Sequence, residues 1–268
     1  MPTELATGQV RPDRRAAMLA AAAPAAAAVT LQLAYPLLEG TARDFVTSAV
    51  VVLLASACVA HAAVTRGLPF AVALLAASAG GGFAVEQLGV HTGFPFCDYS
   101  YGPGIGPTWA GVPLLIGLAW TMLAWPAAIV ARTIARTIAG RILLVRWALA
   151  ATDLFLDPQM VRAGYWSWEH PAPHLPGVAH VPLTNYAGWL AAGLLLSVLL
   201  QLMLRAHDRS AVVPAAADLL PALVYLWLCV GWIVALAVFL SLPAAAGWGA
   251  VASLPIVVMT ARRLRVRA

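Results

Sequence analysis

The sequence predicts an all-α, polytopic integral membrane protein with about eight transmembrane helices, seven being the alternative count. Three observations support this fold class. Hydrophobic residues make up 62% of the 268-residue chain, and the mean hydropathy is +0.85, a composition that soluble domains of this size do not have. The chain contains a series of apolar runs, each long enough to cross a hydrocarbon layer of about 30 Å as a helix. The arginines gather in every second connection between these runs.

The apolar runs give the expected helices in chain order: 16–38, 44–65, 69–89, 111–131, 138–157, 185–205, 217–240 and 243–261. The first run follows Arg14 and Arg15 and has the small residues of a signal-peptide cleavage region. It continues to about Leu38, however, which is long enough to span, so we interpret it as a membrane helix. The last two runs are separated only by residues 241–243, and for this reason the alternative count is seven. We expect one integral domain over 1–268.

The arginine distribution predicts the orientation of the chain. All 16 basic residues are arginine, and with eight spans most fall on the face that holds both termini: Arg11, Arg14, Arg15, Arg66, Arg132, Arg136, Arg141, Arg205, Arg209, Arg262, Arg263, Arg265 and Arg267. Only Arg43 and Arg162 fall on the other face, and Arg146 lies inside a helix. Since basic residues accumulate in cytoplasmic loops, we expect a multi-pass protein of the cell membrane with both termini cytoplasmic. Residues 1–15 and 262–268 would be cytoplasmic tails, the second of them basic.

The net charge of +5 is explained by loops that face anionic lipid, so no nucleic-acid partner is expected.

Two long polar connections, 91–110 and 158–184, then lie together on the non-cytoplasmic side. Both are rich in Gly, Pro and aromatic residues. Connections of this length without a helical pattern are usually functional or disordered, and the aromatic rings argue against disorder. A belt of rings at the membrane surface is the simpler interpretation of each aromatic residue taken singly. We expect the stretches 86–101 and 153–169, which face this side, to form opposite walls of one pocket.

Glu86 is the first candidate catalytic residue. It lies near the end of the third expected helix, after Gly80-Gly81-Gly82, where the backbone permits close approach of another element. Apolar surroundings favour the neutral form of a carboxyl group, which can then act as a general acid. The alternative is an acid near the interface that hydrogen-bonds a neighbouring helix.

Asp153 and Asp157 form the second candidate site. They are four residues apart and therefore share one face of the fifth expected helix. Acids in an apolar run are costly to keep without a purpose. Because two carboxyl groups in one apolar site do not both ionise readily, we expect a proton donor beside a fixed anion. Pro158 is expected to end this helix, and the alternative role of Asp157 is a helix cap.

Other kinds of chemistry find little support in the sequence. The three cysteines are odd in number and two lie in apolar runs, which argues against a disulfide framework or a cysteine metal site. The histidines lack the spacing of metal ligands on a helix, and no phosphate-loop, dinucleotide-binding or nucleophile-elbow sequence occurs. We therefore predict no metal site.

Three blocks of the sequence resemble the carotenoid biosynthesis membrane protein family, which includes the CruF-type carotenoid hydratases and the bisanhydrobacterioruberin hydratases. The blocks are Glu86-x-x-Gly-x-x-Thr-Gly with Tyr99-Ser-Tyr101, Asp153-x-x-x-Asp157-Pro with Gly164-Tyr-Trp-x-Trp168, and Val181-Pro-x-x-Asn185-Tyr-x-Gly-Trp189. With Gly111-Val-Pro113 they cover about residues 80–190 in a specific order. The chain departs from the expected pattern at Cys97, Tyr186 and His180, where Gly, Phe and a small residue are usual. These departures bear on the identity of the substrate more than on the class of reaction, because the acids are unchanged.

The resemblance implies a cofactor-independent hydro-lyase of the carotenoid 1,2-hydratase type. Such an enzyme adds water to the terminal C=C of an acyclic carotenoid end group (lycopene, gamma-carotene or C50 precursor type) and gives a tertiary alcohol. One acid among Glu86, Asp153 and Asp157 would protonate the alkene, and the remaining carboxylate and aromatic faces would stabilise the carbocation. The expected substrate-binding residues are Thr92, Asp98, Tyr99, Tyr101, Trp109, Trp166, Trp168, Asn185 and Trp189. The expected partners are a carotenoid from the bilayer, water, membrane lipids and other enzymes of the carotenoid pathway.

Two other functions stay open at this point. An intramembrane prenyltransferase would use Asp153 and Asp157 to hold magnesium and pyrophosphate, although a second acidic motif and a basic cluster are missing from the sequence. A non-enzymatic carotenoid-binding or carrier protein would also place acids and aromatic rings along a lipid groove.

Overall fold

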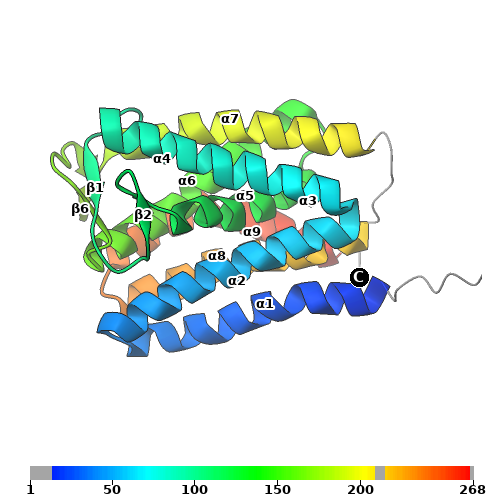
Figure 1. Ribbon diagram of the computed structural model, residues 1–268, viewed down its shortest axis with the longest axis horizontal. Coiled ribbons are helices and arrows are strands. Elements are labelled where there is room, and N and C mark those ends of the chain that lie inside the picture. The colour runs from blue at the N-terminus through cyan, green and yellow to red at the C-terminus, as the bar shows by residue number, and fades with distance from the viewer. Residues whose placement is uncertain (1–13, 209–214, 266–268) are drawn as a thin grey trace, which may run out of the picture.

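The computed structural model describes residues 14–208 and 215–265 as a bundle of long helices whose axes lie alongside one another (Figure 1). The helices are α1 (Arg14–Ala34), η1 (Tyr35–Leu37), α2 (Gly40–Arg66), α3 (Leu68–Leu75), η2 (Ala76–Gly80), α4 (Gly81–Thr92), α5 (Leu115–Ile134), α6 (Ile138–Arg162), α7 (Leu183–Asp208), η3 (Ala215–Asp218), α8 (Leu219–Val234), η4 (Ala235–Phe239) and α9 (Pro243–Arg265). The segments η2 and η4 are π-helical. The segment η2 joins α3 to α4, and η4 extends α8, so that α3–η2–α4 and α8–η4 are each one continuous helix. We call each continuous helix of the bundle a rod.

Seven rods in the described part of the chain are long and apolar enough to cross a membrane. The eighth rod is α6, whose 25 residues extend about 37 Å. It is less apolar because it carries Arg146, Asp153 and Asp157, and both aspartates are buried against other elements of the bundle. The structure therefore has the predicted all-α polytopic membrane fold, and α6 differs in composition because it contributes the acid pair.

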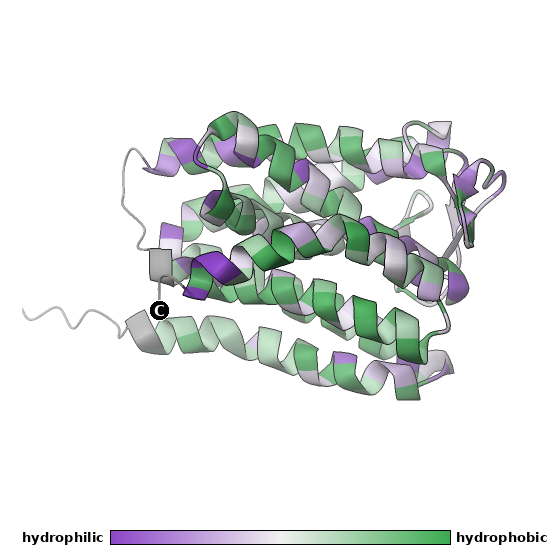
Figure 2. Cartoon of the chain, turned by 180° about the vertical axis from the view of Figure 1, so that it is seen from behind, coloured by the Kyte–Doolittle hydropathy of each residue, from purple (hydrophilic) through white to green (hydrophobic). Residues whose placement is uncertain are grey.

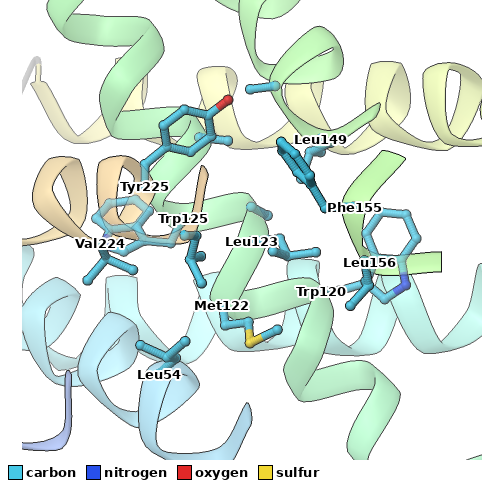
Figure 3. Packing of buried hydrophobic residues seen from close by; sticks show 14 of the residues in the cluster. Leu54, Trp120, Met122, Leu123, Trp125, Leu149, Phe155, Leu156, Val224 and Tyr225 are labelled. Atoms are coloured by element: carbon cyan, nitrogen blue, oxygen red, sulfur yellow. The ribbon is translucent and has the colours of Figure 1, made fainter. Parts of the chain in front are cut away.

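The core of the bundle is built around α5. Nearly every residue from Ile116 to Ile134 is buried, and α5 packs against α2, α6, α8 and η2. A helix that is apolar on all sides is one that the protein interior covers completely. Figure 3 shows Trp120, Leu123 and Trp125 of α5 among side chains of the neighbouring helices. This central helix forms one wall of the cavity described below.

The bundle has two chemically different ends. The strands lie at one end, on the left of Figure 1, whereas the start of α1 and the end of α9 lie together at the other. At the second end Arg66 donates two hydrogen bonds of 2.8 Å to the Asp218 carboxylate, and Arg132 pairs with Asp208 at 2.7 Å. Figure 2 shows hydrophilic residues gathered at the two ends and hydrophobic residues along the helices between them. This distribution suits a bundle that crosses a hydrocarbon layer.

The arginines follow the predicted alternation as far as the structure describes them. Arg43 and Arg162 lie at the strand end, and the opposite end holds Arg66, Arg132, Arg136, Arg141, Arg205, Arg262, Arg263 and Arg265. Arg11, Arg209, Arg267 and the tail residues 1–13 and 266–268 lie outside the described residues. The expected basic tail is helical up to Arg265, because α9 continues past the predicted end at 261.

The end of α6 corrects two sequence expectations. The helix does not stop before Pro158 but continues to Arg162. Tertiary contacts stabilise the extra turn, because the buried Gln159 side chain accepts a 2.9 Å hydrogen bond from Trp232 Nε1. Asp157 therefore lies inside the helix and is not its cap.

Six short strands form in the connections between α4 and α5 and between α6 and α7. They are β1 (Tyr99–Tyr101), β2 (Thr108–Trp109), β3 (Val112–Pro113), β4 (Trp166–Trp168), β5 (His174–Leu175) and β6 (Val178–Pro182). They pair as antiparallel ribbons β1–β4, β2–β3 and β5–β6. Since β1 and β4 come from different connections, the two connections lie edge to edge at this ribbon.

Candidate active site

The β1–β4 ribbon places four aromatic rings on one face. Tyr99 lies opposite Trp168 and Tyr101 lies opposite Trp166, with a pair of serines between them. Successive side chains of a strand point to opposite faces, so the four rings share one side and the serines the other. The serines are exposed, whereas the rings are buried or nearly so. All four rings line one cavity inside the bundle, so this buried position differs from an interfacial belt.

Glu86 of α4 accepts hydrogen bonds from three side chains. The hydroxyl groups of Tyr99 and Tyr101 donate to Oε2 at 2.5 and 2.7 Å, and Trp120 Nε1 donates to Oε1 at 3.0 Å. Burial, followed by the neighbouring Glu86, raises the pKa of both tyrosine hydroxyls, so they keep their protons and remain donors at neutral pH. Three donors around one carboxyl group stabilise its negatively charged form.

Two glycines of α4 allow these donors to come close. A Cβ atom on Gly82 would fall within the Trp120 indole, and one on Gly89 would lie 2.8 Å from the Tyr99 hydroxyl oxygen. The other two glycines of the 80–82 run face open space. Close approach therefore depends on Gly82 alone within that run.

Asp153 and Asp157 of α6 meet at one amide group. Asn185 Nδ2, from the first turn of α7, donates to Asp153 Oδ2 at 2.9 Å and also to Asp157 Oδ2. Trp166 Nε1 donates to Asp157 Oδ1 at 3.1 Å. Both acids are buried, and Asp153 Oδ1 has no hydrogen-bond partner among the residues that the structure describes. Two carboxyl groups bridged in this way and removed from water can hold one proton between them more cheaply than two negative charges.

The two acid sites face one cavity of about 570 Å³. Glu86 and Asp157 lie on its wall, whereas Asp153 lies behind Asp157 and does not reach the cavity. Most of the wall is apolar or aromatic. The aromatic residues of the wall are Tyr35, Phe96, Tyr99, Tyr101, Trp120, Trp166, Trp168, Trp189, Trp227, Trp232 and Phe239.

Several of these rings stack next to the acids. Trp120, which donates to Glu86, lies flat on Trp189 with ring centroids 4.4 Å apart and planes 13° apart. Tyr101 meets Trp166 edge-on at 5.7 Å. The faces of aromatic rings attract positive charge, so the cavity combines a carboxyl group held by three donors, a pair of acids bridged by one amide, and surfaces that can stabilise a cation.

Eight predicted site residues line the cavity together: Glu86, Asp157, Tyr99, Tyr101, Trp166, Trp168, Asn185 and Trp189. Sequence reasoning missed Trp120, which is in contact with Glu86. The available signal was an indole N–H inside the otherwise apolar α5 run, because a buried tryptophan usually needs an acceptor for that group.

Three predicted substrate-binding residues lie outside the cavity. Thr92 is exposed, and its hydroxyl donates to the Leu88 carbonyl at 2.6 Å at the end of α4. Asp98 is exposed just before β1. Trp109 is 69% exposed and stacks on Phe83 with centroids 6.1 Å apart. Their contacts in the structure are those of a helix end and of the surface, and none of the three lines the cavity.

The unusual Cys97 has a conformational explanation. Its backbone φ angle is +71°, in the left-handed region that glycine adopts most easily. This left-handed backbone geometry explains why the family resemblance leads us to expect Gly at position 97. The Tyr186 hydroxyl, another departure, is buried and has no hydrogen-bond partner in the described residues.

The acids are surrounded by groups that donate hydrogen bonds. Asn185 Nδ2 and Trp166 Nε1 occupy oxygens that a magnesium ion would require, and Mg²⁺ prefers oxygen ligands. Within the described ranges, no three His, Cys, Asp or Glu side chains come together. The donor set of the pair does not fit a magnesium–diphosphate site.

Comparison with known proteins agrees with the sequence resemblance. Residues 47–254, which run from α2 into α9, match the carotenoid biosynthesis protein family. The chain is also similar to the bisanhydrobacterioruberin hydratase of Haloarcula japonica, with 32% identity over 116 residues. That alignment covers 41% of this chain and 38% of the hydratase. No solved structure matches the chain. Because the family match extends over most of the helical bundle, the chain belongs to the carotenoid biosynthesis protein family.

Proposed function

We propose that this protein is a carotenoid hydratase that adds water to the terminal C=C of an acyclic carotenoid end group and forms a tertiary alcohol. The observation that carries the proposal is the presence of two differently held acid sites on one aromatic cavity. Family membership and the similarity to a hydratase support the same reaction class. Lycopene, gamma-carotene and C50 precursors have the required kind of end group.

The hydrogen bonds favour different roles for the two sites. We assign the proton donor to the Asp153–Asp157 pair, with Asp157 as the member that reaches the substrate. Glu86, which receives three donors, is the fixed anion and the base. A positioned acid or base of this kind typically contributes about 10²–10⁴-fold to a rate.

The reaction then needs one proton transfer and one water addition. The O–H bond of the aspartate pair breaks as a C–H bond forms at the less substituted alkene carbon, and positive charge develops on the tertiary carbon. The Glu86 carboxylate and the ring faces of Trp166 and Trp120 stabilise this cation. Water forms the C–O bond and loses a proton to Glu86, and return of that proton to the aspartate pair through water completes the cycle. The sum is addition of one H₂O without any change of oxidation state or redox cofactor.

The arginine pattern supports an orientation for this chemistry. We place the end that carries Arg66 and Arg265 on the cytoplasmic side of the cell membrane, because basic residues concentrate there. The acids and the β1–β4 ribbon then lie toward the opposite side. The carotenoid comes from the bilayer among membrane lipids, and other carotenoid enzymes are the partners that supply and remove it.

A test uses cells that make an acyclic carotenoid. Expression of the wild-type chain should give pigment one water heavier, measured by mass spectrometry. Asp157→Asn and Glu86→Gln should each lower the amount of hydrated product by about 10²-fold or more. Glu169→Gln is the matched control, since Glu169 is an exposed acid next to β4, and it should leave the product unchanged.

Two results would speak against the hydratase, and a third would speak against the assigned mechanism. Unchanged pigment with the wild-type chain that binds carotenoid supports the carrier alternative. Activity that requires Mg²⁺ and an isoprenoid diphosphate supports the prenyltransferase alternative. Normal hydration by stably expressed Asp157→Asn and Glu86→Gln variants would overturn the assigned mechanism.

A further inference from the structure

The cavity that holds the acids also reaches the outer surface of the bundle. Leu33 of α1 and Leu37 of η1 line it, yet their side chains are largely exposed. The same is true of Val234 and Phe239 on the α8–η4 rod. Exposed residues from both sides therefore border one opening of the cavity, whereas Glu86 and Asp157 line the same cavity and are buried. We call this opening the lateral mouth.

The helices on either side of the lateral mouth belong to different packing units. α1 packs mainly on α2, while α8 packs on α5 and α9, and Figure 1 shows α1 at the edge of the bundle beside α2. One hydrogen bond joins the two borders: Trp227 Nε1 donates to Gln32 Oε1 at 2.8 Å. A π-helical segment, η4, begins directly after Val234, and such segments often occur at functional sites.

The chemistry of the mouth suits lipid better than water. No charged side chain lines the cavity at these borders, and the polar groups of Gln32 and Trp227 satisfy each other. Pairing of this kind is what polar groups need within a hydrocarbon layer. Both borders belong to helices that are long and apolar enough to cross a membrane, so the mouth opens toward the bilayer.

The size of the cavity indicates what occupies it. A volume of about 570 Å³ is in the range of about 300–1,000 Å³ that suits a drug-sized ligand. A carotenoid is much longer, so only its reacting end and part of its chain can lie inside. We propose that the lateral mouth between α1–η1 and α8–η4 admits a long isoprenoid chain from the bilayer and holds its unreacted part along Leu33, Val234 and Phe239. This inference rests on the proposed function for the identity of the chain.

The test narrows the mouth without touching the acids. Val234→Trp and Leu33→Trp each place a large ring on one border. Their matched controls are Val238→Trp on η4 and Leu19→Trp on α1, which are exposed residues of the same rods that do not line the cavity. Val234 and Val238 are 48% and 67% exposed, so all four variants are expected to fold, which thermal unfolding in detergent checks.

The measured quantity is the amount of lycopene that co-purifies with each variant in nanodiscs, read from visible absorbance per protein. The two mouth variants should lose about tenfold in bound pigment, equivalent to 1.4 kcal/mol, and the controls should match the wild type. Equal pigment in all variants would overturn the lateral mouth. Because the experiment measures binding, its result is independent of catalysis. Pigment whose binding depends on the mouth residues but which is never hydrated would support the lateral mouth and contradict the proposed hydratase function.

Discussion

Tyr101 and Trp166 face each other across the β1–β4 ribbon, and each holds a different acid. The Tyr101 hydroxyl donates to Glu86 at 2.7 Å, the Trp166 indole donates to Asp157 at 3.1 Å, and the two ring centroids lie 5.7 Å apart. One cross-strand pair therefore fixes the relative position of two acids that come from α4 and α6. Since the residues belong to different connections, folding of the ribbon assembles the site.

The first prediction concerns these two donors. Tyr101→Phe and Trp166→Phe keep an aromatic ring but remove the group that donates to the acid. A hydrogen bond to a charged group contributes about 1.5–3 kcal/mol, so each variant should lower kcat for carotenoid hydration by about 10–100-fold with little change in KM. Single-turnover assays in nanodiscs measure this.

The double variant shows whether the pair acts as a unit. If the two acids work through the Tyr101–Trp166 contact, the combined loss will differ from the sum of the single losses by about 0.5 kcal/mol or more. Strict additivity would show that the contact does not couple them. Ser100→Ala and Ser167→Ala, on the outer face of the same ribbon, are the controls and should retain wild-type kinetics.

A second prediction follows from the amide that bridges the aspartates. Asn185→Leu removes the Nδ2 group that both carboxyl groups share. Leaving buried polar groups without a partner costs about 1–3 kcal/mol each. Thermal unfolding in detergent should therefore show a clear loss of stability, and hydration should fall with it. Thr184→Val, one residue earlier and exposed, should have the wild-type melting temperature, and the bridging role is refuted if Asn185→Leu has it too.

Much of the fold and part of the site could be predicted from the sequence. The lengths of the apolar runs and the alternation of arginine between connections were enough to predict the helices, because both can be seen in short stretches of sequence. Glu86 and Asp157 were identifiable because polar groups in apolar runs need a reason to be there, whereas Asn185 was identified only through the family resemblance.

The pairing of β1 with β4 could not be predicted, because it joins segments that are far apart in the chain and too short to show a strand pattern. The same holds for the extension of α6 beyond Pro158. There the packing of Gln159 against Trp232 overrides the local preference of proline.

A third prediction separates neighbouring glycines of α4. Gly82→Ala should push Trp120 away from Glu86, since the new Cβ has no room beside the indole. Overpacking of this kind costs about 1–3 kcal/mol, and the loss of the Trp120 hydrogen bond should also reduce hydration. Gly81→Ala is the adjacent control, because open space surrounds it and a helical Ala is favoured over Gly by about 0.5–1 kcal/mol. Similar melting temperatures for the two variants would contradict the packing described here.

The last prediction concerns Cys97, whose φ of +71° lies where glycine is most at ease. A non-glycine residue in this left-handed region costs about 1–2 kcal/mol. The Cys97 side chain offsets this with a long 3.9 Å contact to the His170 carbonyl and with partial packing against the core. Cys97→Gly should therefore raise the melting temperature, while hydration stays the same because Cys97 does not line the cavity. Cys58→Gly is the contrasting variant. Cys58 lies buried inside α2, where glycine lowers helix stability and leaves a void, so its melting temperature should fall. A lower melting temperature for Cys97→Gly would show that the thiol contact outweighs the backbone strain.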